Sequence, residues 1–385
     1  MPKLWDIITQ SAEVALLSQK ADGSMPPGHN GPYRDPETPV RNTAHWLITF
    51  LHCYEHTRKD EFKAAAQNAA DYLLTSEPRP MAQVFWCRTN QAKDFSNGLI
   101  GQAWVIEALA AASCKLKLPR YKELAKNVFN LHPFDEKKAL WKVVNVDGSH
   151  RDFDMTFNHQ LWFAAAGALL CEDSQDAVAK KVMRFLDKMT EMFKISPSGL
   201  ISHPLVLKVN TIKDCKKKVF GLYKRLRYIS KTPEYKEAGY HPFNLYAMAI
   251  LKERFQSHSF WQTKKFRAAL EYINTDKFSE LLSSSAHNSD FYRMPVHPDT
   301  PSCNRYGYPY NPVGFEVAFA LKVFSAPSSD TNSKMSFWAS SQFNSNFDFD
   351  TNMLSRDTED PVTLAARIYE ATRLPNLDIE ITPEN

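Results

Sequence analysis

Glycine is scarce in this chain, with only 12 among 385 residues. Neither G-x-G-x-x-G nor the phosphate-loop pattern G-x-x-x-x-G-K-[ST] occurs, so no nucleotide-phosphate site is indicated. We find no run of about 18 apolar residues and expect no transmembrane segment. The formal net charge of +4 is too small to indicate a nucleic-acid partner. These absences argue against a nucleotide-phosphate site, a membrane-spanning segment and a nucleic-acid partner.

The six cysteines are scattered, without any C-x-x-C spacing. Cys53, Cys114 and Cys171 lie in apolar stretches with helical spacing, so we expect buried thiols rather than disulfides or a zinc site. Residues 1–13 carry charges and no apolar core of the kind found in signal peptides. We therefore expect a cytoplasmic protein with no metal and no organic cofactor.

Apolar helices alternate with amphipathic ones along the chain. Six nearly uncharged helices are predicted to begin near residues 41, 96, 156, 241, 311 and 360, each accompanied by a more charged helix. A helix without a polar face must be buried on all sides. Six such helices inside six amphipathic ones predict an all-α fold, an (α/α)6 toroid. Strand signals are few, and residues 143–146 are the best candidate for a short hairpin.

We expect a single domain over residues 1–375, with an insertion at about 196–238 and an acidic, loosely held tail at 376–385. The insertion contains the basic run 213–227, K-D-C-K-K-K-V-F-G-L-Y-K-R-L-R. This run could make weak contact with an anionic surface, or it could simply be solvated. The sequence leaves both interpretations open.

Polar and aromatic residues recur at the junctions where the predicted inner helices begin. In a toroid these junctions share one rim, so their side chains converge. Flat rings can stack on a sugar, amides and carboxylates can bind its hydroxyls, and arginine can pair with a uronate. The predicted substrate-binding residues are Arg41, His45, Asn97, Gln102, Trp104, Asn158, Trp162, His241, Arg305, Tyr306 and Tyr308.

Each of these residues also has an ordinary structural interpretation. The asparagines could cap helices, and the tryptophans and histidines could fill the core. Asp360 is expected to be only a helix cap, because Pro361 follows it at the first helical position. The repetition of polar residues at equivalent junctions favours function, since an interior helix gains nothing from buried polar groups.

Asp154 is the residue for which a catalytic role is most strongly predicted. It precedes an apolar helix and lies among aromatic residues, so partial burial should raise its pKa toward that of a proton donor. Asp152 adds a like charge that would separate the two pKa values. We predict Asp154, Asp152 and His159 as the catalytic residues, with helix capping as the alternative for either carboxylate.

The run D-M-T-F-N-H-Q-L-W-F-A, which begins at Asp154, resembles a motif of the unsaturated glucuronyl and rhamnogalacturonyl hydrolases. In those α/α-toroid enzymes the aspartate protonates the double bond of an unsaturated uronic sugar and activates water. The resemblance therefore implies hydrolysis, with Asp154 as general acid and base. A second aspartate of that family is absent here, because Asn97-Gly98 stands at its place.

The run from Asn158 to Trp162 is similar to the N-H-x-x-W signature of toroid polysaccharide lyases. That resemblance implies that asparagine neutralises a uronate while His159 or a tyrosine, such as Tyr306 or Tyr308 with Arg305, moves the α-proton. The wider pattern resembles uncharacterised toroid proteins of surface-glycan biosynthesis clusters. We expect a hydrolase-like enzyme acting on a small-molecule or oligosaccharide substrate that contains uronic acid. A lyase, an epimerase and a non-catalytic glycan-binding or scaffold protein are the alternatives.

Overall fold

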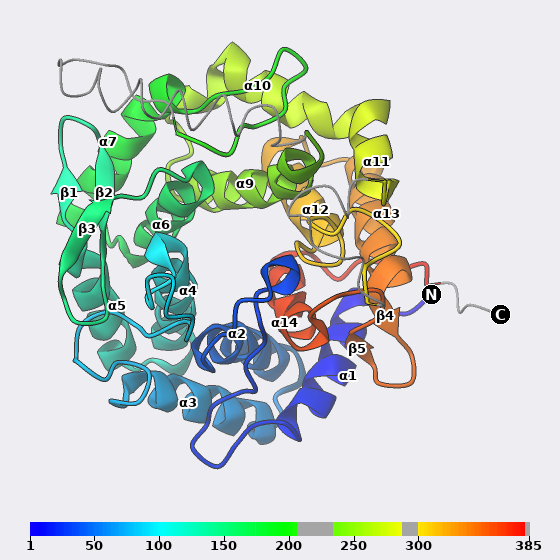
Figure 1. The fold of residues 1–385 in the computed structure, drawn as a ribbon. Coiled ribbons are helices and arrows are strands. Elements are labelled where there is room, and N and C mark those ends of the chain that lie inside the picture. Colours follow the sequence, from blue (N-terminus) through cyan, green and yellow to red (C-terminus); the bar gives the residue numbers. More distant parts are fainter. Residues whose placement is uncertain (174, 206–233, 287–298, 382–385) are drawn as a thin grey trace.

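Two concentric rings of helices make up the fold, as the computed structural model shows for residues 1–173, 175–205, 234–286 and 299–381 (Figure 1). The architecture confirms the predicted (α/α)6 toroid. The inner ring contains α2 (Val40–Thr57), α4 (Gly98–Leu116), α6 (Phe157–Leu170), α9 (Glu234–Arg254), α12 (Val313–Phe324), and α14 (Pro361–Ala366) with its continuation η4 (Arg367–Arg373). The outer ring contains α1 (Leu4–Leu16), α3 (Asp60–Leu74), α5 (Pro119–Leu131), α7 (Ala177–Met192), α10 (Lys264–Glu271), α11 (Asp276–Ser283) and α13 (Ser329–Asn346).

The difference in polarity between the helices explains which ring each one joins. In α6 every residue from Leu161 to Ala168 is buried, and none of them is charged. The outer helix α5 buries only a stripe with helical spacing, which consists of Tyr121, Ala125, Val128 and Phe129. The two helices approach closely at Gly167, where an added Cβ atom would lie 2.6 Å from the Phe129 ring.

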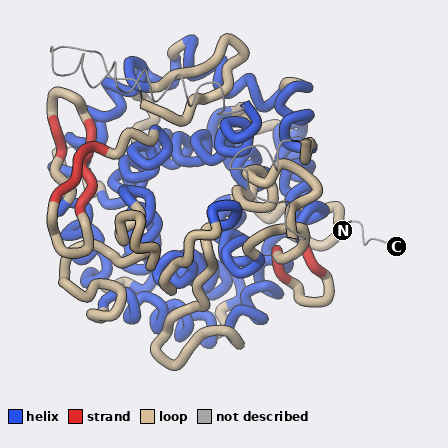
Figure 2. The backbone as a smooth tube through the Cα atoms, in the orientation of Figure 1, coloured by secondary structure: helices blue, strands red, loops and turns tan. Residues whose placement is uncertain are grey.

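Short strands and 3-10 turns complete the described chain. The strands β1 (Phe134–Asp135), β2 (Leu140–Val144) and β3 (His150–Phe153) form an antiparallel sheet, which confirms the predicted hairpin. A second pair consists of β4 (Phe347–Asp348) and β5 (Met353–Leu354). Figure 2 shows both sheets at the periphery of the ring. The remaining turns are η1 (Gly31–Tyr33), η2 (Ser259–Gln262) and η3 (Tyr272–Asn274).

Helix α9 begins earlier than predicted. It starts at Glu234, inside the stretch expected to be an insertion, and it continues through Pro242. Proline lacks the N–H that would close a helical hydrogen bond, so its presence made residue 241 look like a helix start. The earlier start places Lys236 in the first turn of an inner helix. The basic run 213–227 lies outside the described residues.

The first and last described segments pack against each other. Leu4 N donates to Leu377 O at 2.9 Å, Ile379 N donates to Pro2 O at 3.0 Å, and Lys3 pairs with Asp378 at 2.7 Å. Ile379 is fully buried. The expectation of a loosely held tail is therefore wrong for residues 376–381, because these contacts close the ring between its first and last helices.

Two further expectations concern the cysteines and α4. Cys53, Cys87 and Cys171 are buried free thiols in the described chain, but Cys114 is exposed because it lies near the end of α4.

By length and composition alone, α4 could cross a membrane, contrary to the sequence prediction. In the toroid 72% of its apolar window is buried inside the protein, as befits an inner helix.

Candidate functional site

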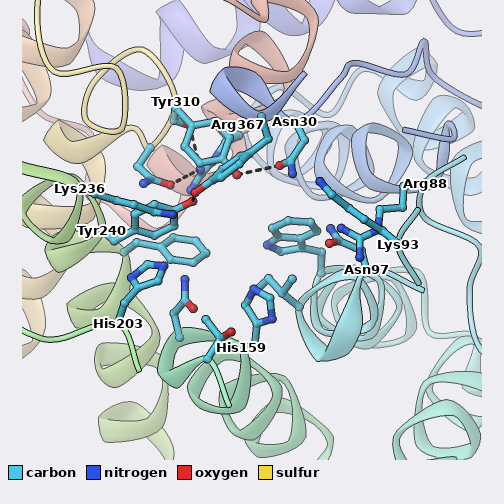
Figure 3. A pocket seen from close by; sticks show the side chains of 17 residues that line it. Asn30, Arg88, Lys93, Asn97, His159, His203, Lys236, Tyr240, Tyr310 and Arg367 are labelled. Carbon is cyan, nitrogen blue, oxygen red and sulfur yellow. Dashed lines mark hydrogen bonds between the residues drawn. The ribbon is translucent and has the colours of Figure 1, made fainter. Parts of the chain in front are cut away.

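A cavity of about 270 Å³ lies at the rim where the inner helices begin (Figure 3). Each of the six helix pairs contributes to it, through the loop before its inner helix or through the inner helix itself. The residues that line it are Asn30, Tyr33, Arg88, Lys93, Asn97, Ile100, Trp104, Thr156, Asn158, His159, His203, Lys236, Tyr240, Phe243, Tyr310, Asn311 and Arg367. Within the described ranges, then, the lining contains two imidazoles and four cationic side chains but no carboxylate.

Asp154 holds His159 in place at the start of α6. Its carboxylate accepts the backbone N–H of Thr156 at 3.1 Å and receives His159 Nδ1 at 2.7 Å. Because side chains in the first turn point back toward the helix N-terminus, His159 lines the cavity while Asp154 lies behind it. An ionised carboxylate only accepts hydrogen bonds, so Nδ1 carries the proton and Nε2 is left for a ligand.

The expected rise in the pKa of Asp154 is wrong. Burial acts to raise this pKa, but the His159 ring and the hydrogen bonds from Thr156 outweigh burial, so the pKa falls below 3.8. Asp154 is therefore ionised at neutral pH and does not supply a proton. Asp152 is exposed on β3 and does not line the cavity, and the charges and hydrogen bonds that lower the pKa of Asp154 come from His159 and Thr156.

The start of α4 packs directly against the Asp154–His159 pair. Gly98 has φ +58°, and a Cβ atom there would lie 2.6 Å from Asp154 Oδ2 and 3.4 Å from His159 Nδ1. Asn97 also has left-handed backbone, with φ 54°, and its side chain lines the cavity. The Asn97-Gly98 step thus lets the chain approach the pair closely, at the place where the resembling hydrolases carry an aspartate.

Lys236 and His203 form one wall of the cavity. The Lys236 ammonium lies 5.0 Å from the ring centre of Tyr33, 5.7 Å from that of Tyr240 and 5.4 Å from that of Tyr306. Burial lowers the pKa of Lys236 to about 8. His203 lies edge-on to Tyr240, with ring centres 4.5 Å apart. Burial, together with the positive charge of Lys236 and the neighbouring His159, lowers the pKa of His203 well below 6.5, so its ring is neutral.

Arg88 and Lys93 enter from the opposite side in Figure 3, and carboxylates balance both. Arg88 pairs with Asp35 at 3.1 Å and with Asp94 at 2.6 Å, and Lys93 pairs with Asp35 at 3.1 Å. Asp94 also accepts the backbone N–H of Gly98 at 2.6 Å. The ion pairs with Asp35 join the loop before α4 to the loop before α2, and the Asp94 hydrogen bond joins it to the helix start, so these contacts organise the wall of the cavity.

The side chain of Arg367 is held in place by hydrogen bonds to buried residues. Its guanidinium donates to Glu370 at 2.8 Å, to Glu316 at 3.0 Å, and to Asn311 Oδ1 at 2.7 Å. Burial and the neighbouring Glu370 carboxylate raise the pKa of Glu316 well above 4.5, and burial together with the charge of Glu107 raises that of Glu370 to about 7. One proton shared by the two glutamates would relieve their repulsion. Arg367 therefore holds Asn311 and the helix ends together, and its hydrogen bonds point into the protein.

Comparison with known proteins identifies the family. No protein-family model matches the chain. Archaeal glycosylation protein Q of Haloferax volcanii is 41% identical over 390 residues, which cover 98% of this chain and 99% of that protein. The chain belongs to the archaeal glycosylation protein Q family.

Several solved structures share the fold of this glycosylation protein Q family member. D-mannose isomerase matches with a TM-score of 0.60 at 13% identity, over 96% of each chain. A sugar epimerase from a ruminal bacterium matches at 0.58 and 10%, over 96% of this chain and 98% of that one. Unsaturated glucuronyl hydrolase specific for heparin matches at 0.57 and 10%, over 96% of each. These likenesses show the fold alone, and they confirm the predicted relation to α/α-toroid carbohydrate-active proteins.

Three of the predicted substrate-binding residues line the cavity of this family member, namely Asn97, Trp104 and Asn158. His159, predicted as catalytic, lines it as well. Asn158 is 3% exposed, and its Oδ1 atom is buried without a hydrogen-bond partner. A buried amide oxygen without a partner is costly, so a ligand that donates a hydrogen bond would be favoured beside it.

Several other predicted residues support the cavity from behind. Arg41 stacks on Trp104, with its guanidinium carbon 4.1 Å from the ring centre, and pairs with Glu37 at 3.2 Å. His45 stacks on Tyr369 with ring centres 4.3 Å apart, and both of its ring nitrogens lack partners.

The remaining predicted residues have structural roles or lie outside the lining. Gln102 binds the backbone of Phe85 and Ser96, His241 binds that of Ile201 and Ala269, and Trp162 donates to Phe243 O. Arg305 pairs with Glu359, and neither Tyr306 nor Tyr308 lines the cavity. The amide, imidazole and indole groups among them mainly satisfy buried backbone, which is the structural interpretation given above.

The sequence analysis missed His203 because long-range backbone contacts position it. Phe157 N donates to His203 O at 2.8 Å, and Leu205 N donates to Met155 O at 3.0 Å. This pairing brings a loop that follows α7 beside the first turn of α6. Other missed residues lie on long loops or in the early turns of α9 and η4, where the only signal was the abundance of cationic and aromatic residues: Asn30, Tyr33, Arg88, Lys93, Lys236, Tyr310 and Arg367.

Proposed function

We propose that this protein is a sugar isomerase or epimerase that moves a proton at a carbon atom next to a carbonyl group. The observation that carries the proposal is the composition of the cavity lining. Two imidazoles face the cavity, whereas none of its lining residues in the described chain is a carboxylate. Glycosidases generally need two carboxyl groups flanking the scissile bond. Imidazole acid–base chemistry therefore fits this cavity better than hydrolysis does.

His159 is the proposed base. Nδ1 is bound to ionised Asp154 at 2.7 Å, so Nε2 offers its lone pair to the cavity. When Nε2 takes a proton from carbon, the carboxylate behind the ring compensates the new positive charge. Asp154 thus has a positioning and electrostatic role in place of the acid role predicted from the sequence.

His203 is the proposed electrophile. Its lowered pKa keeps the ring neutral, and a neutral imidazole N–H can donate a hydrogen bond to a carbonyl oxygen. As the proton moves from carbon to His159, the electron pair moves to that oxygen and an enediolate forms. Transfer of the neighbouring hydroxyl proton to that oxygen, with return of the first proton to the former carbonyl carbon, completes an aldose–ketose isomerisation. Return to the opposite face of the same carbon completes an epimerisation, so neither outcome involves net oxidation.

The proposed substrate is a sugar unit, with a hexuronic acid as the favoured class. A cavity of about 270 Å³ is near the lower end of the range of about 300–1,000 Å³ for small-molecule sites, which suits one sugar ring. Trp104 provides a flat surface and Asn158 an amide. The name of the 41% identical relative, a glycosylation protein, supports a sugar destined for a glycan.

The proposal is tested by following deuterium uptake by NMR while the protein is incubated in D2O with hexuronates and hexoses. We expect deuterium at the carbon next to the carbonyl, with signal abolished in His159→Ala and in His203→Ala. His150→Ala is the matched control, because His150 is an exposed imidazole outside the cavity lining. No exchange with any sugar would refute the proposal. Loss of the absorbance of a 4,5-unsaturated uronide would instead favour the hydrolase, and its appearance the lyase.

A further inference from the structure

We propose that Gln160 is a positioning residue for the base His159, and that it acts by fixing the backbone of Asp154. This inference rests on the proposed function for the role of His159. It goes further by naming the contact that aligns the base. Asp154 touches the imidazole directly, whereas Gln160 reaches it only through Asp154.

The hydrogen bonds of the Gln160 amide are the first observation. Gln160 lies in the first turn of α6 and is fully buried. Its Oε1 atom accepts the backbone N–H of Trp141 at 3.0 Å, and its Nε2 atom donates to Trp141 O at 2.8 Å and to Asp154 O at 3.1 Å. An amide nitrogen carries two hydrogens, so both are used. The side chain therefore joins α6 to β2 and to the segment that carries Asp154.

The place of Asp154 beside the small sheet is the second observation. Lys142 in β2 is paired with Phe153 in β3, so Trp141 and Asp154 are the next opposite residues along these antiparallel strands. Strand β3 ends at Phe153, and Asp154 begins the segment that leads to α6. The Gln160 amide bonds to both Trp141 and Asp154. Gln160 therefore fixes Asp154 at the point where strand pairing ends.

Trp141 gives this contact a rigid anchor. The indole is fully buried, and four aromatic side chains surround it with ring centres 4.7–5.7 Å away: Phe129, Phe134, Phe163 and Phe185. Close-packed side chains of this kind resist displacement. Because Gln160 couples Asp154 to this cluster, the carboxylate stays where it receives His159 Nδ1 at 2.7 Å. Without the amide, the Asp154 backbone could shift and His159 would lose its alignment.

The test compares Gln160→Leu with Gln342→Leu, which is the matched control. Gln342 in α13 is also fully buried, and its amide also makes three hydrogen bonds. Its Oε1 atom accepts the backbone N–H of Gly314 at 3.2 Å, and its Nε2 atom donates to Tyr308 O at 3.1 Å and to Asn346 Oδ1 at 2.8 Å. None of these residues lines the cavity. The two variants should therefore lose similar stability in urea unfolding, and only the first should disturb the base.

Two measurements report on the base itself. In ¹⁵N NMR the His159 ring of the wild-type protein should carry its proton on Nδ1, whereas in Gln160→Leu it should populate both tautomers. Deuterium exchange into the sugar should fall about 10–100-fold in kcat, the effect of a small misplacement of a catalytic group, with KM changed less than about 3-fold. Gln342→Leu should keep the wild-type ring spectrum and change the exchange rate less than about 3-fold.

A double-mutant cycle shows whether Gln160 acts through Asp154. In an Asp154→Asn background, Gln160→Leu should lower the exchange rate little further, whereas independent effects would multiply. Multiplying effects would overturn the inference, and so would an unchanged His159 spectrum in Gln160→Leu or an equal loss of exchange in Gln160→Leu and Gln342→Leu.

Gln160→Met is the second variant, because methionine is unbranched like glutamine and fills the same space without an amide. Failure of both Gln160 variants to fold, when Gln342→Leu folds, would show that Gln160 serves folding and would also overturn the inference. Absence of exchange with every sugar would refute the proposed function alone, because the His159 spectrum would still decide the role of Gln160.

Discussion

Replacing Gly98 by alanine is the sharpest test of how the site is assembled. The new Cβ atom would lie 2.6 Å from Asp154 Oδ2, a separation that real Cβ contacts do not reach. Either α4 or the Asp154 carboxylate must then move. Since α4 is an inner helix packed on its neighbours, we expect the carboxylate to move and the Asp154–His159 hydrogen bond of 2.7 Å to break.

The expected magnitude has two parts. The left-handed backbone at φ +58° costs alanine roughly 1–2 kcal/mol. Loss of a hydrogen bond to a charged group adds roughly 1.5–3 kcal/mol. Gly148→Ala is the matched control, because Gly148 also has left-handed φ, +84°, but its added Cβ would meet only the flexible side chain of Gln83. We therefore expect Gly98→Ala to lower the free energy of unfolding by roughly 2.5–5 kcal/mol and the control by only the first part.

Urea unfolding measures these free energies, and ¹⁵N NMR of the His159 ring reports whether Nδ1 is still bound to Asp154. Deuterium exchange into the sugar should fall in Gly98→Ala and persist in Gly148→Ala. Equal destabilisation of the two variants, together with an unchanged His159 ring spectrum, would show that the contact between α4 and Asp154 does not hold the imidazole.

Two further predictions use the pKa shifts. Asp154→Asn should lower the free energy of unfolding at pH 7 by about 1–3 kcal/mol. The pKa of Asp154 is lower in the folded protein, so its contribution is present above pH 4 and is lost as the pH falls through the folded pKa. The difference between wild type and variant should therefore shrink in urea titrations at pH 3, and a constant difference would contradict the assigned pKa. His45→Phe should stabilise the protein increasingly as the pH falls below about 6.5, because the buried imidazole has a lowered pKa and only the unfolded chain takes up the proton. Thermal unfolding at pH 7 and pH 5 checks this, and an identical difference at both pH values would count against it.

The site itself was only partly predictable. Asn97, Trp104, Asn158 and His159 line the cavity because each lies at the start of an inner helix, and the convergence of those starts follows from the fold. Other polar residues at the same junctions turned out to satisfy buried backbone groups. Gln102 is one of these, since its amide binds both the N–H and the carbonyl of Phe85. Residue type and spacing do not distinguish an amide that faces a ligand from one that faces a loop.

What the sequence determined by itself is the arrangement of helices. An uncharged segment such as Leu161–Ala168 must be buried, and amphipathic helices must cover it, so the polarity pattern alone specifies two rings. The sequence also predicted a local interaction correctly: Asp360 caps α14 by accepting the N–H of Thr363 at 3.2 Å. The polarity pattern of a helix and its capping both depend on residues that are close together in the sequence.

Only the tertiary structure decided which charges meet. It sets His203 beside the first turn of α6 through backbone hydrogen bonds to Met155 and Phe157, and it balances Arg88 and Lys93 with Asp35, more than 50 residues earlier in the chain. The pKa of Asp154 falls because a histidine meets its carboxylate, although burial alone would have raised it. Electrostatic free energies depend on the distances between charged groups across the fold, and the local sequence does not specify those distances.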